Sequence, residues 1–429
     1  MSNHPNCCAT LAVLLVASSM LMASGAIAQP MVFGHLDSVG QVDVPSPNYR
    51  CDVAVDGHLA VLGSANNAAY LIDVSNPANP QLRSTIVTQS FTPDVQIKDT
   101  LVYLGLSPGQ GIYSGDAVLI VNVANPDSPQ VVGTFGHPGM TDCPALFLAD
   151  TLLFAGSYGG RQLEIINVAN PAEPESVGSW LYPQAGSVVG AHIHDIFVRD
   201  HIVYLAYWEA GLQIVDVSNP ASPVWIGQVA IPGTTCHSLW VDANRRAYVV
   251  DLHSQFPSSV LHVIDLSDPA DAHILSSQYW CTRDPLHFLS GNDRVPGVVM
   301  AAHHTCGVWA IDADAVGNSY VVDEYTHPGD LLGFWGAAFD GRYVYGANME
   351  HGLYVFEFHW AARGDFDGNH AVDLRDVVLL INFVLRGGPP PAISPNQADW
   401  NCDGVYDMLD VAAAIDCSFR GGPGPCSGP

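Results

Sequence analysis

Short runs of apolar residues, separated by polar turns, recur along the chain between about residues 35 and 360. Within a run apolar and polar residues alternate, and Gly, Asn or Pro marks its ends, which is typical of short β-strands. The first unit of this pattern contains four such runs, at 52–55, 59–63, 70–74 and 81–87. The period of an amphipathic helix is absent from this region of the sequence. The pattern therefore predicts an all-β fold built from four-stranded units.

One ten-residue string, an apolar strand followed by an Asn-Pro turn, repeats through the same region. Its clear copies begin at Leu71, Ile120, Ile165, Ile214 and Val263, and worn copies begin at Ala310 and Val355. Their spacing of 45 to 49 residues gives seven units before residue 360. Parallel β-helices have much shorter coils, and helical solenoids need a helical period. A four-stranded sheet repeated seven times predicts a seven-bladed β-propeller.

The seventh unit lacks a fourth strand after its third one at 353–358. The segment 35–40, which precedes the first unit, resembles the fourth strands at 130–134 and 175–179. We therefore expect the amino-terminal strand to complete the last blade. This arrangement closes the ring and removes an exposed sheet edge.

The best copies of the repeat, such as LQIVDV at 212–217, resemble the LVIVD-repeat family of bacteria and archaea. The resemblance covers about 330 residues of the chain. It implies a β-propeller in an extracellular setting. Because that family has no well-defined shared activity, the resemblance implies little about chemistry.

The first 28 residues contain no Asp, Glu, Lys or Arg, carry an apolar run at 11–22 and end in Ala26-Ile27-Ala28. This pattern predicts a secretory signal peptide cleaved before Gln29, with an uncleaved membrane anchor as the alternative. No later stretch approaches the ~18 apolar residues of a membrane span, so we expect none in the mature chain. The predicted domains are the signal peptide at 1–28, the propeller at 29–362 and a C-terminal domain at 363–429, in a secreted or cell-surface protein.

After residue 363, Asp and Asn fall at positions 1, 3, 5, 9 and 12 of a loop, and the same spacing returns 34 residues later. Oxygen ligands at this spacing wrap one hard cation, and the backbone carbonyl at position 7 completes the shell. The predicted calcium ligands are Asp365, Asp367, Asn369, Ala371, Asp373 and Asp376 in the first loop, and Asp399, Asn401, Asp403, Val405, Asp407 and Asp410 in the second. Two Ca²⁺ ions are expected, and the alternative is a pair of Asp-rich solvated turns without metal.

Each loop leads into an apolar helix, and both helices end in Arg-Gly-Gly-Pro. This duplicated unit resembles a dockerin domain, which also has Asp at position 12, and the resemblance implies a cohesin-type scaffold protein as partner. In dockerins with Ser or Thr at loop positions 10 and 11, those residues contact cohesin. The residues at these positions are Leu374, Arg375, Met408 and Leu409, which implies an apolar docking patch. His370 replaces the Gly of position 6 and predicts a weaker first site, since a non-Gly residue at positive φ costs about 1 to 2 kcal/mol.

Histidines gather in the loops that should open on one face of the propeller, and the chain has 18 His against 14 Lys and Arg together. The candidate ligands for copper or zinc are His194, His237, His287, and His303 or His304. The favoured alternative is structural, because Asp52, Asp94 and Asp195 share one position of the repeat and His194 and His237 share the position before it. Residues that recur in this way usually hold loop backbone. Metalloprotease, serine-hydrolase and phosphate-binding motifs are absent from the sequence.

Charge and cysteine content narrow the class of protein further. Acidic residues number 42 against 14 basic ones, and the formal net charge is -28, which excludes nucleic acid and anionic membranes as partners. The eight cysteines left after signal cleavage are an even number in an oxidising compartment. We predict some disulfides, with Cys281–Cys306 favoured in the propeller and Cys402 paired with Cys417 or Cys426.

Two classes of function remain. The first is a secreted, non-catalytic interaction protein whose propeller presents loops to a glycan or protein and whose dockerin-like domain docks onto a cohesin-type scaffold. The alternative is an extracellular enzyme of a polysaccharide-degrading complex, or a metal-dependent oxidase, that acts at the His-rich face of the propeller.

Overall fold

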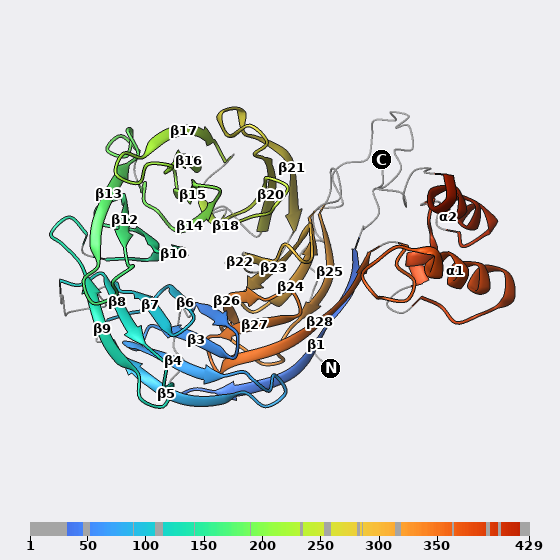
Figure 1. Ribbon diagram of the computed structural model, residues 1–429, viewed down its shortest axis with the longest axis horizontal. Coiled ribbons are helices and arrows are strands. Elements are labelled where there is room, and N and C mark those ends of the chain that lie inside the picture. The colour runs from blue at the N-terminus through green and yellow to red at the C-terminus, as the bar shows by residue number, and fades with distance from the viewer. Residues whose placement is uncertain are drawn as a thin grey trace, which may run out of the picture.

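The computed structural model describes residues 32–45, 52–88, 90–107, 115–140, 142–188, 190–231, 235–252, 259–280, 284, 286–313, 319–362, 364–391, 395–401 and 405–420. In this part of the chain, 28 strands form seven four-stranded antiparallel sheets. Figure 1 shows these sheets arranged as blades in a ring. The seven-bladed β-propeller predicted from the repeat is confirmed.

The blades are numbered here by the chain order of their first strands. Blade 1 contains β2 (Val53–Asp56), β3 (Leu59–Ser64), β4 (Ala68–Asp73) and β5 (Gln81–Val87); blade 2 contains β6 (Val95–Lys98), β7 (Leu101–Gly105), β8 (Val118–Asn122) and β9 (Gln130–Phe135). Blade 3 contains β10 (Ala145–Ala149), β11 (Leu152–Gly156), β12 (Gln162–Asn167) and β13 (Glu175–Leu181); blade 4 contains β14 (Asp195–Arg199), β15 (Ile202–Ala206), β16 (Leu212–Asp216) and β17 (Val224–Val229). Blade 5 contains β18 (Cys236–Val241), β19 (Arg246–Asp251), β20 (Ser259–Asp265) and β21 (His273–Trp280); blade 6 contains β22 (Leu289–Gly291), β23 (Val298–His303), β24 (Gly307–Asp312) and β25 (Tyr320–Tyr325). Blade 7 contains β26 (Phe334–Phe339), β27 (Tyr343–Asn348), β28 (Gly352–Ala362) and β1 (Val32–Asp43).

The amino-terminal strand closes the ring, as predicted. β1 pairs antiparallel with β28 over its whole length, from Val32 opposite Ala362 to Asp43 opposite Gly352. Its Leu36 is buried with the core of blades 6 and 7, and its backbone N–H donates to Asp323 of β25 at 2.7 Å. Blade 7 is therefore completed from both ends of the propeller sequence.

The core of the propeller lies between neighbouring blades. In the described residues, seven clusters of buried apolar side chains occupy the seven blade-to-blade interfaces. The cluster between blades 7 and 1, for example, joins Tyr345 and Leu353 to Leu62 and Ile72. Second and third strands are buried on both faces, whereas fourth strands such as β9 are largely exposed. This difference explains why the third strand carries the clearest apolar run of the repeat.

A close approach between neighbouring blades explains both the Asn-Pro turn and a recurring glycine. A Cβ atom built on Gly178 of β13 would lie 1.9 Å from the carbonyl oxygen of Pro220, in the turn of blade 4. The same atom on Gly133 of β9 would lie 1.9 Å from the carbonyl oxygen of Pro171. No side chain fits at such distances, so the absence of a Cβ lets these blades meet.

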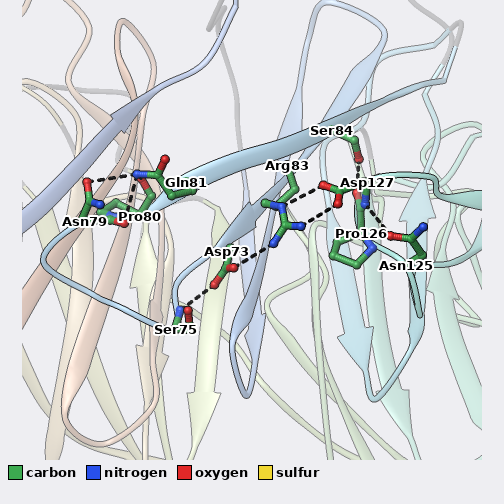
Figure 2. A network of polar contacts seen from close by, with 10 residues as sticks. All are labelled: Asp73, Ser75, Asn79, Pro80, Gln81, Arg83, Ser84, Asn125, Pro126 and Asp127. Atoms are coloured by element: carbon green, nitrogen blue, oxygen red, sulfur yellow. Dashed lines mark hydrogen bonds and ion pairs between the residues drawn. The ribbon is translucent and has the colours of Figure 1, made fainter.

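Blades 1 and 2 meet through hydrogen bonds at the equivalent place, which Figure 2 shows. Ser84 of β5 donates its hydroxyl to the carbonyl oxygen of Pro126 at 2.6 Å. The adjacent Arg83 donates to Asp73 of its own blade at 3.0 Å and to Asp127 of the next blade at 2.7 and 2.8 Å. The turn that defines the sequence repeat is therefore a contact between blades.

Two helices follow the propeller, α1 (Leu374–Arg386) and α2 (Met408–Arg420). They lie outside the ring, beside the ends of β1 and β28 (Figure 1). Val377 and Leu380 of α1 and Val411 and Ala414 of α2 are buried together with Trp400, so the predicted apolar helix faces form a small separate core. In the described segments, two 3₁₀ helices, η2 (Pro269–Asp271) and η3 (Pro395–Ala398), precede β21 and α2 respectively.

Several predictions concern residues outside the described part of the chain. The predicted signal peptide at 1–28 lies there, and so do Cys281, Cys402 and Cys426. The signal peptide and the disulfide pairs therefore remain predictions. Neither helix α1 nor α2, nor any other helix among the described residues, has the length and apolar character needed to cross a bilayer.

Candidate functional site

The first calcium loop brings three of its predicted ligands together. Oxygen atoms of Asp365, Asp367 and Asp376 lie within 4.8 Å of one another, and Asp365 and Asp376 are fully buried. The Asp365 carboxylate accepts backbone N–H groups from Gly368 at 2.9 Å and His370 at 2.9 Å, which wraps the loop around it. Burial raises the pKa of Asp365. Three converging carboxylates fit a hard divalent cation, which would neutralise their mutual repulsion.

The Asp at position 12 makes equivalent hydrogen bonds in the two loops. Asp376 accepts N–H groups of Asp367 at 3.2 Å and Asp373 at 2.8 Å. Asp410 accepts the corresponding N–H groups of Asn401 at 3.1 Å and Asp407 at 2.9 Å. In both loops this Asp also stands in the first turn of the following helix.

The remaining predicted ligands have different surroundings. The Asn369 side chain accepts the N–H of Ala371 at 2.9 Å. Asp373 caps α1 by accepting the N–H of Arg375 at 2.7 Å. Asp399 is buried and Val405 is exposed, whereas Asp403 lies outside the described residues. The second site is therefore only partly visible, but its described half repeats the first.

His370 occupies the strained position that its place in the loop predicts. Its φ is +68°, a conformation that favours glycine. Its ring stacks on Trp360 of β28, with 4.4 Å between ring centroids and 18° between planes. Such a stack contributes about 0.5 to 1.5 kcal/mol beyond the buried area. The His therefore joins the first loop to the propeller, which offsets part of its backbone strain.

The predicted docking residues lie on the surface of the two helices. The exposed fractions are 54% for Leu374, 53% for Met408 and 60% for Leu409. Val378, one helical turn after Leu374, is 57% exposed. The fourth predicted residue, Arg375, forms an ion pair with Asp367 at 2.9 Å. Three of the four positions are thus exposed apolar side chains, and Val378 extends the patch along α1.

At the other candidate site, four aromatic rings from consecutive blades form what we call the histidine arc: His194, His237, His287 and Trp335. Their ring centroids are separated in turn by 3.8, 4.2 and 3.8 Å. Nδ1 of His194 lies 3.1 Å from the carbonyl oxygen of His237, and Nδ1 of His237 lies 3.1 Å from that of His287. Because a carbonyl oxygen only accepts, both rings carry their proton on Nδ1 and their lone pair on Nε2.

The surroundings of His237 favour its neutral form. Burial, followed by the neighbouring imidazoles of His194 and His287, holds the pKa of His237 well below its usual value. His304 is next to the arc, 5.0 Å from His287 and 5.3 Å from Trp335 between ring centroids. Its φ of +34° is unusual for a non-glycine residue.

His303 does not join the arc. Its ring lies edge-on to Trp309 at 4.3 Å, and its Nε2 is 2.5 Å from the carbonyl oxygen of Asp284. Burial lowers the pKa of His303 to about 4. Among the described residues, the groups of three ligand atoms within 4.8 Å of one another include no member of the arc. The transition-metal site at this face therefore remains a prediction.

A cavity of about 320 Å³ opens beside the arc. Its lining residues are Phe91, Pro93, Ser107, Asp142, Pro144, Tyr158, His194, Phe288 and Trp335. The Asp142 carboxylate accepts the N–H of Tyr158 at 2.9 Å and the hydroxyl of Ser157 at 2.8 Å, which fixes it in the wall. Aromatic faces with a few fixed polar groups are typical of small-ligand sites. These aromatic residues come from several blades, so the sequence does not show them as a group, although Phe288 directly follows His287.

The recurring aspartates hold neighbouring blades together, which agrees with their structural interpretation. Asp52, Asp94 and Asp195 accept the backbone N–H groups of Val95, Leu146 and Leu239 in the next blade, at 3.3, 2.7 and 2.9 Å respectively. Burial raises the pKa of Asp52 to about 7 and that of Asp195 to about 6. These carboxyl groups, protonated or only partly ionised, therefore link the innermost strands of neighbouring blades.

Comparisons with known proteins agree with this architecture. The family model of the dockerin type I domain matches residues 363–415, and that of the LVIVD repeat matches residues 48–88 and 191–230. Dockerin type I domains generally bind calcium and join a cohesin partner. No curated protein matches the chain. The crystal structure of the computationally designed Ika8 protein is similar at 12% identity with a TM-score of 0.50, over 75% of this chain and 99% of that one, which shows the fold alone.

Proposed function

We propose that this chain, which joins a seven-bladed β-propeller with LVIVD repeats to a dockerin type I domain, is a secreted, non-catalytic interaction protein. The dockerin domain holds it on a cohesin-type scaffold. The propeller then offers its aromatic-walled cavity to a glycan. The observation that carries the proposal is the pair of matching loop–helix units, in which three of the four residues at positions 10 and 11 are exposed and apolar.

Calcium controls the docking step in this proposal. Each ion would be held by one loop, the first by Asp365, Asp367, Asn369, Ala371, Asp373 and Asp376, and the second by Asp399, Asn401, Asp403, Val405, Asp407 and Asp410. The bound charge offsets repulsion among the carboxylates and orders the start of each helix. Leu374, Met408 and Leu409, one residue or two before each position-12 Asp, would then be presented in fixed geometry.

A glycan is the proposed ligand of the propeller because of the cavity's composition. Trp335, Phe288 and Tyr158 offer flat apolar faces, and Asp142 and Ser107 offer polar groups in the lining. The apolar face of a sugar ring stacks on an aromatic side chain while its hydroxyls hydrogen-bond. A net charge of -28 argues against an anionic ligand.

Calorimetry with a type I cohesin domain tests the docking half. Leu409→Asp places a charge in the apolar patch, and we expect it to weaken cohesin binding at least tenfold in saturating calcium. Leu331→Asp is the matched control, since Leu331 is 80% exposed on the propeller. Equal affinity of Leu409→Asp and the wild type would contradict the proposed docking surface.

Titration with neutral plant-wall oligosaccharides tests the cavity. Trp335→Ala should abolish binding, whereas Trp225→Ala, which removes a 40% exposed Trp on the outer strand β17, should leave it unchanged. If the wild type binds none of these sugars, the glycan part of the proposal is wrong and the docking part stands.

A further inference from the structure

Four side chains of kinds that bind metal ions lie in a square on β1 and β28, the two outer strands of blade 7. His35 is directly opposite His359 in the register of β1 and β28, and Asp37 is directly opposite Glu357. Residues two apart in a strand share one face, so all four side chains project from the same side of the sheet. The two imidazole rings stack at 4.7 Å with 24° between their planes. We call these four residues the closing-strand square.

The separations within the square match a metal centre better than a hydrogen-bonded pair. Asp37 Oδ2 lies 3.3 Å from His35 Nε2 and 3.4 Å from His359 Nε2. Ligand atoms bound tetrahedrally at ~2.0 to 2.1 Å from zinc stand about 3.3 Å apart, whereas N–H to oxygen hydrogen bonds are mostly ~2.7 to 3.2 Å. Ligand atoms of His35, Asp37 and His359 all lie within 4.8 Å of one another.

Glu357, the fourth member of the square, already has a hydrogen-bond partner for one of its two oxygens. Arg342 donates to Glu357 Oε1 at 2.7 and 2.9 Å. The other oxygen, Oε2, lies 3.8 Å from His359 Nε2. Arg342 thus fixes Glu357 and offsets its charge, while a single carboxylate, Asp37, and two imidazoles remain for an ion.

We propose that His35, Asp37 and His359 bind one zinc ion, with water at the fourth position. Two imidazoles and one carboxylate suit zinc, whereas calcium takes oxygen ligands. The side chains of His35 and His359 are 46% and 38% exposed, so an ion reaches them from solvent without any opening of the fold.

The site would act as a clip on the ring. It joins β1, the strand that closes the propeller, to β28, the strand that leads into the dockerin domain. An ion that binds the two strands only when they are paired stabilises the closed ring. This role is independent of cohesin or glycan binding.

A second His and Asp group is the main competitor for zinc. His327, Asp330 and His351 also lie within 4.8 Å of one another. There, however, His327 Nδ1 is 2.6 Å from Asp330 Oδ1, and Asn348 donates to Asp330 Oδ2 at 2.6 Å. His351 Nε2 lies 3.4 Å from Asp330 Oδ1, but the two 2.6 Å contacts are short hydrogen bonds that already occupy both oxygens of Asp330.

The test uses the full chain, stripped with chelator and then saturated with calcium, in a zinc titration followed by calorimetry and thermal melting. The variants His35→Gln and Asp37→Asn remove ligands from the square. His351→Gln removes one from the competing group, and His58→Gln removes an exposed turn histidine as the matched control.

We expect zinc to raise the melting temperature of the wild type, His58→Gln and His351→Gln proteins by several degrees. In His35→Gln and Asp37→Asn the rise should disappear and the stoichiometry should fall by one zinc per chain. The variants should melt like the wild type without zinc, because their side chains are at the surface. An unchanged zinc response in His35→Gln, loss of the response in His351→Gln, or no zinc binding by the wild type would overturn the proposal.

Discussion

Gly178→Ala is expected to destabilise the propeller strongly although it adds one methyl group. The new Cβ would lie 1.9 Å from the carbonyl oxygen of Pro220, and real Cβ atoms essentially never approach closer than 3.0 Å. Blade 3 and the turn of blade 4 would therefore have to separate by at least 1.1 Å. Overpacking of this kind costs about 1 to 3 kcal/mol, and the gap also weakens dispersion contacts along the interface. We expect a loss of about 3 kcal/mol.

Thermal melting in saturating calcium, followed by tryptophan fluorescence, measures this loss. For a domain of this size a change of about 3 kcal/mol should lower the melting temperature by roughly 5 °C or more. Gly186→Ala is the matched control in the loop that follows the same strand, since a Cβ there meets nothing within 4 Å. It should leave stability unchanged or raise it slightly. If both variants melt together, the glycine contact between blades does not stabilise the ring as described.

Deletion of β1, a rise in pH and removal of calcium should each lower the stability of part or all of the protein. Deleting residues 32–44 removes β1, so blade 7 would lose its fourth strand. The melting temperature should then fall by far more than after an ordinary terminal truncation. A change of one or two degrees would show that the ring closes otherwise. The free energy of unfolding should fall as pH rises from about 4 to 6, because burial raises the pKa of Asp195 to about 6 and the folded protein keeps a proton that the unfolded chain has released. The Asp195→Asn variant should lack about 3 kcal/mol of this pH dependence. Identical pH profiles of the variant and the wild type would refute this expectation. Removing calcium with a chelator should unfold α1 and α2 without unfolding the strands, because the negative charges of the buried Asp365 and Asp376 would be left uncompensated. Circular dichroism that shows unchanged helicity would count against calcium-dependent folding.

The repeat made the propeller predictable from the sequence. A single unit is ambiguous, but seven copies at one spacing constrain the strand number, the order of strands and the closure of the ring. The glycine in the fourth strand that follows the Asn-Pro turn, as at Gly178, also recurs in the sequence. Its partner Pro220 belongs to the next blade, so their contact follows only from the packing of one blade on another.

The arrangement of histidines was less predictable because it depends on side-chain direction. His303 is the last residue of β23 and packs on Trp309, whereas His304 follows the strand with a φ of +34° and lies beside the arc. The closing-strand square joins His35 and His359, which are more than 300 residues apart in the sequence. Their pairing depends on the register of β1 against β28, and no local pattern specifies that register.

If calcium-loaded repeats dock this propeller onto cohesin, the mass of the complex in solution must depend on calcium. Light scattering of the full chain mixed with a type I cohesin domain should give a one-to-one complex in calcium. Chelator should separate the complex into its two components, and added calcium should restore it. Components that remain separate in calcium with a panel of cohesins, or a complex that survives the chelator, would show that calcium-loaded repeats do not dock this propeller.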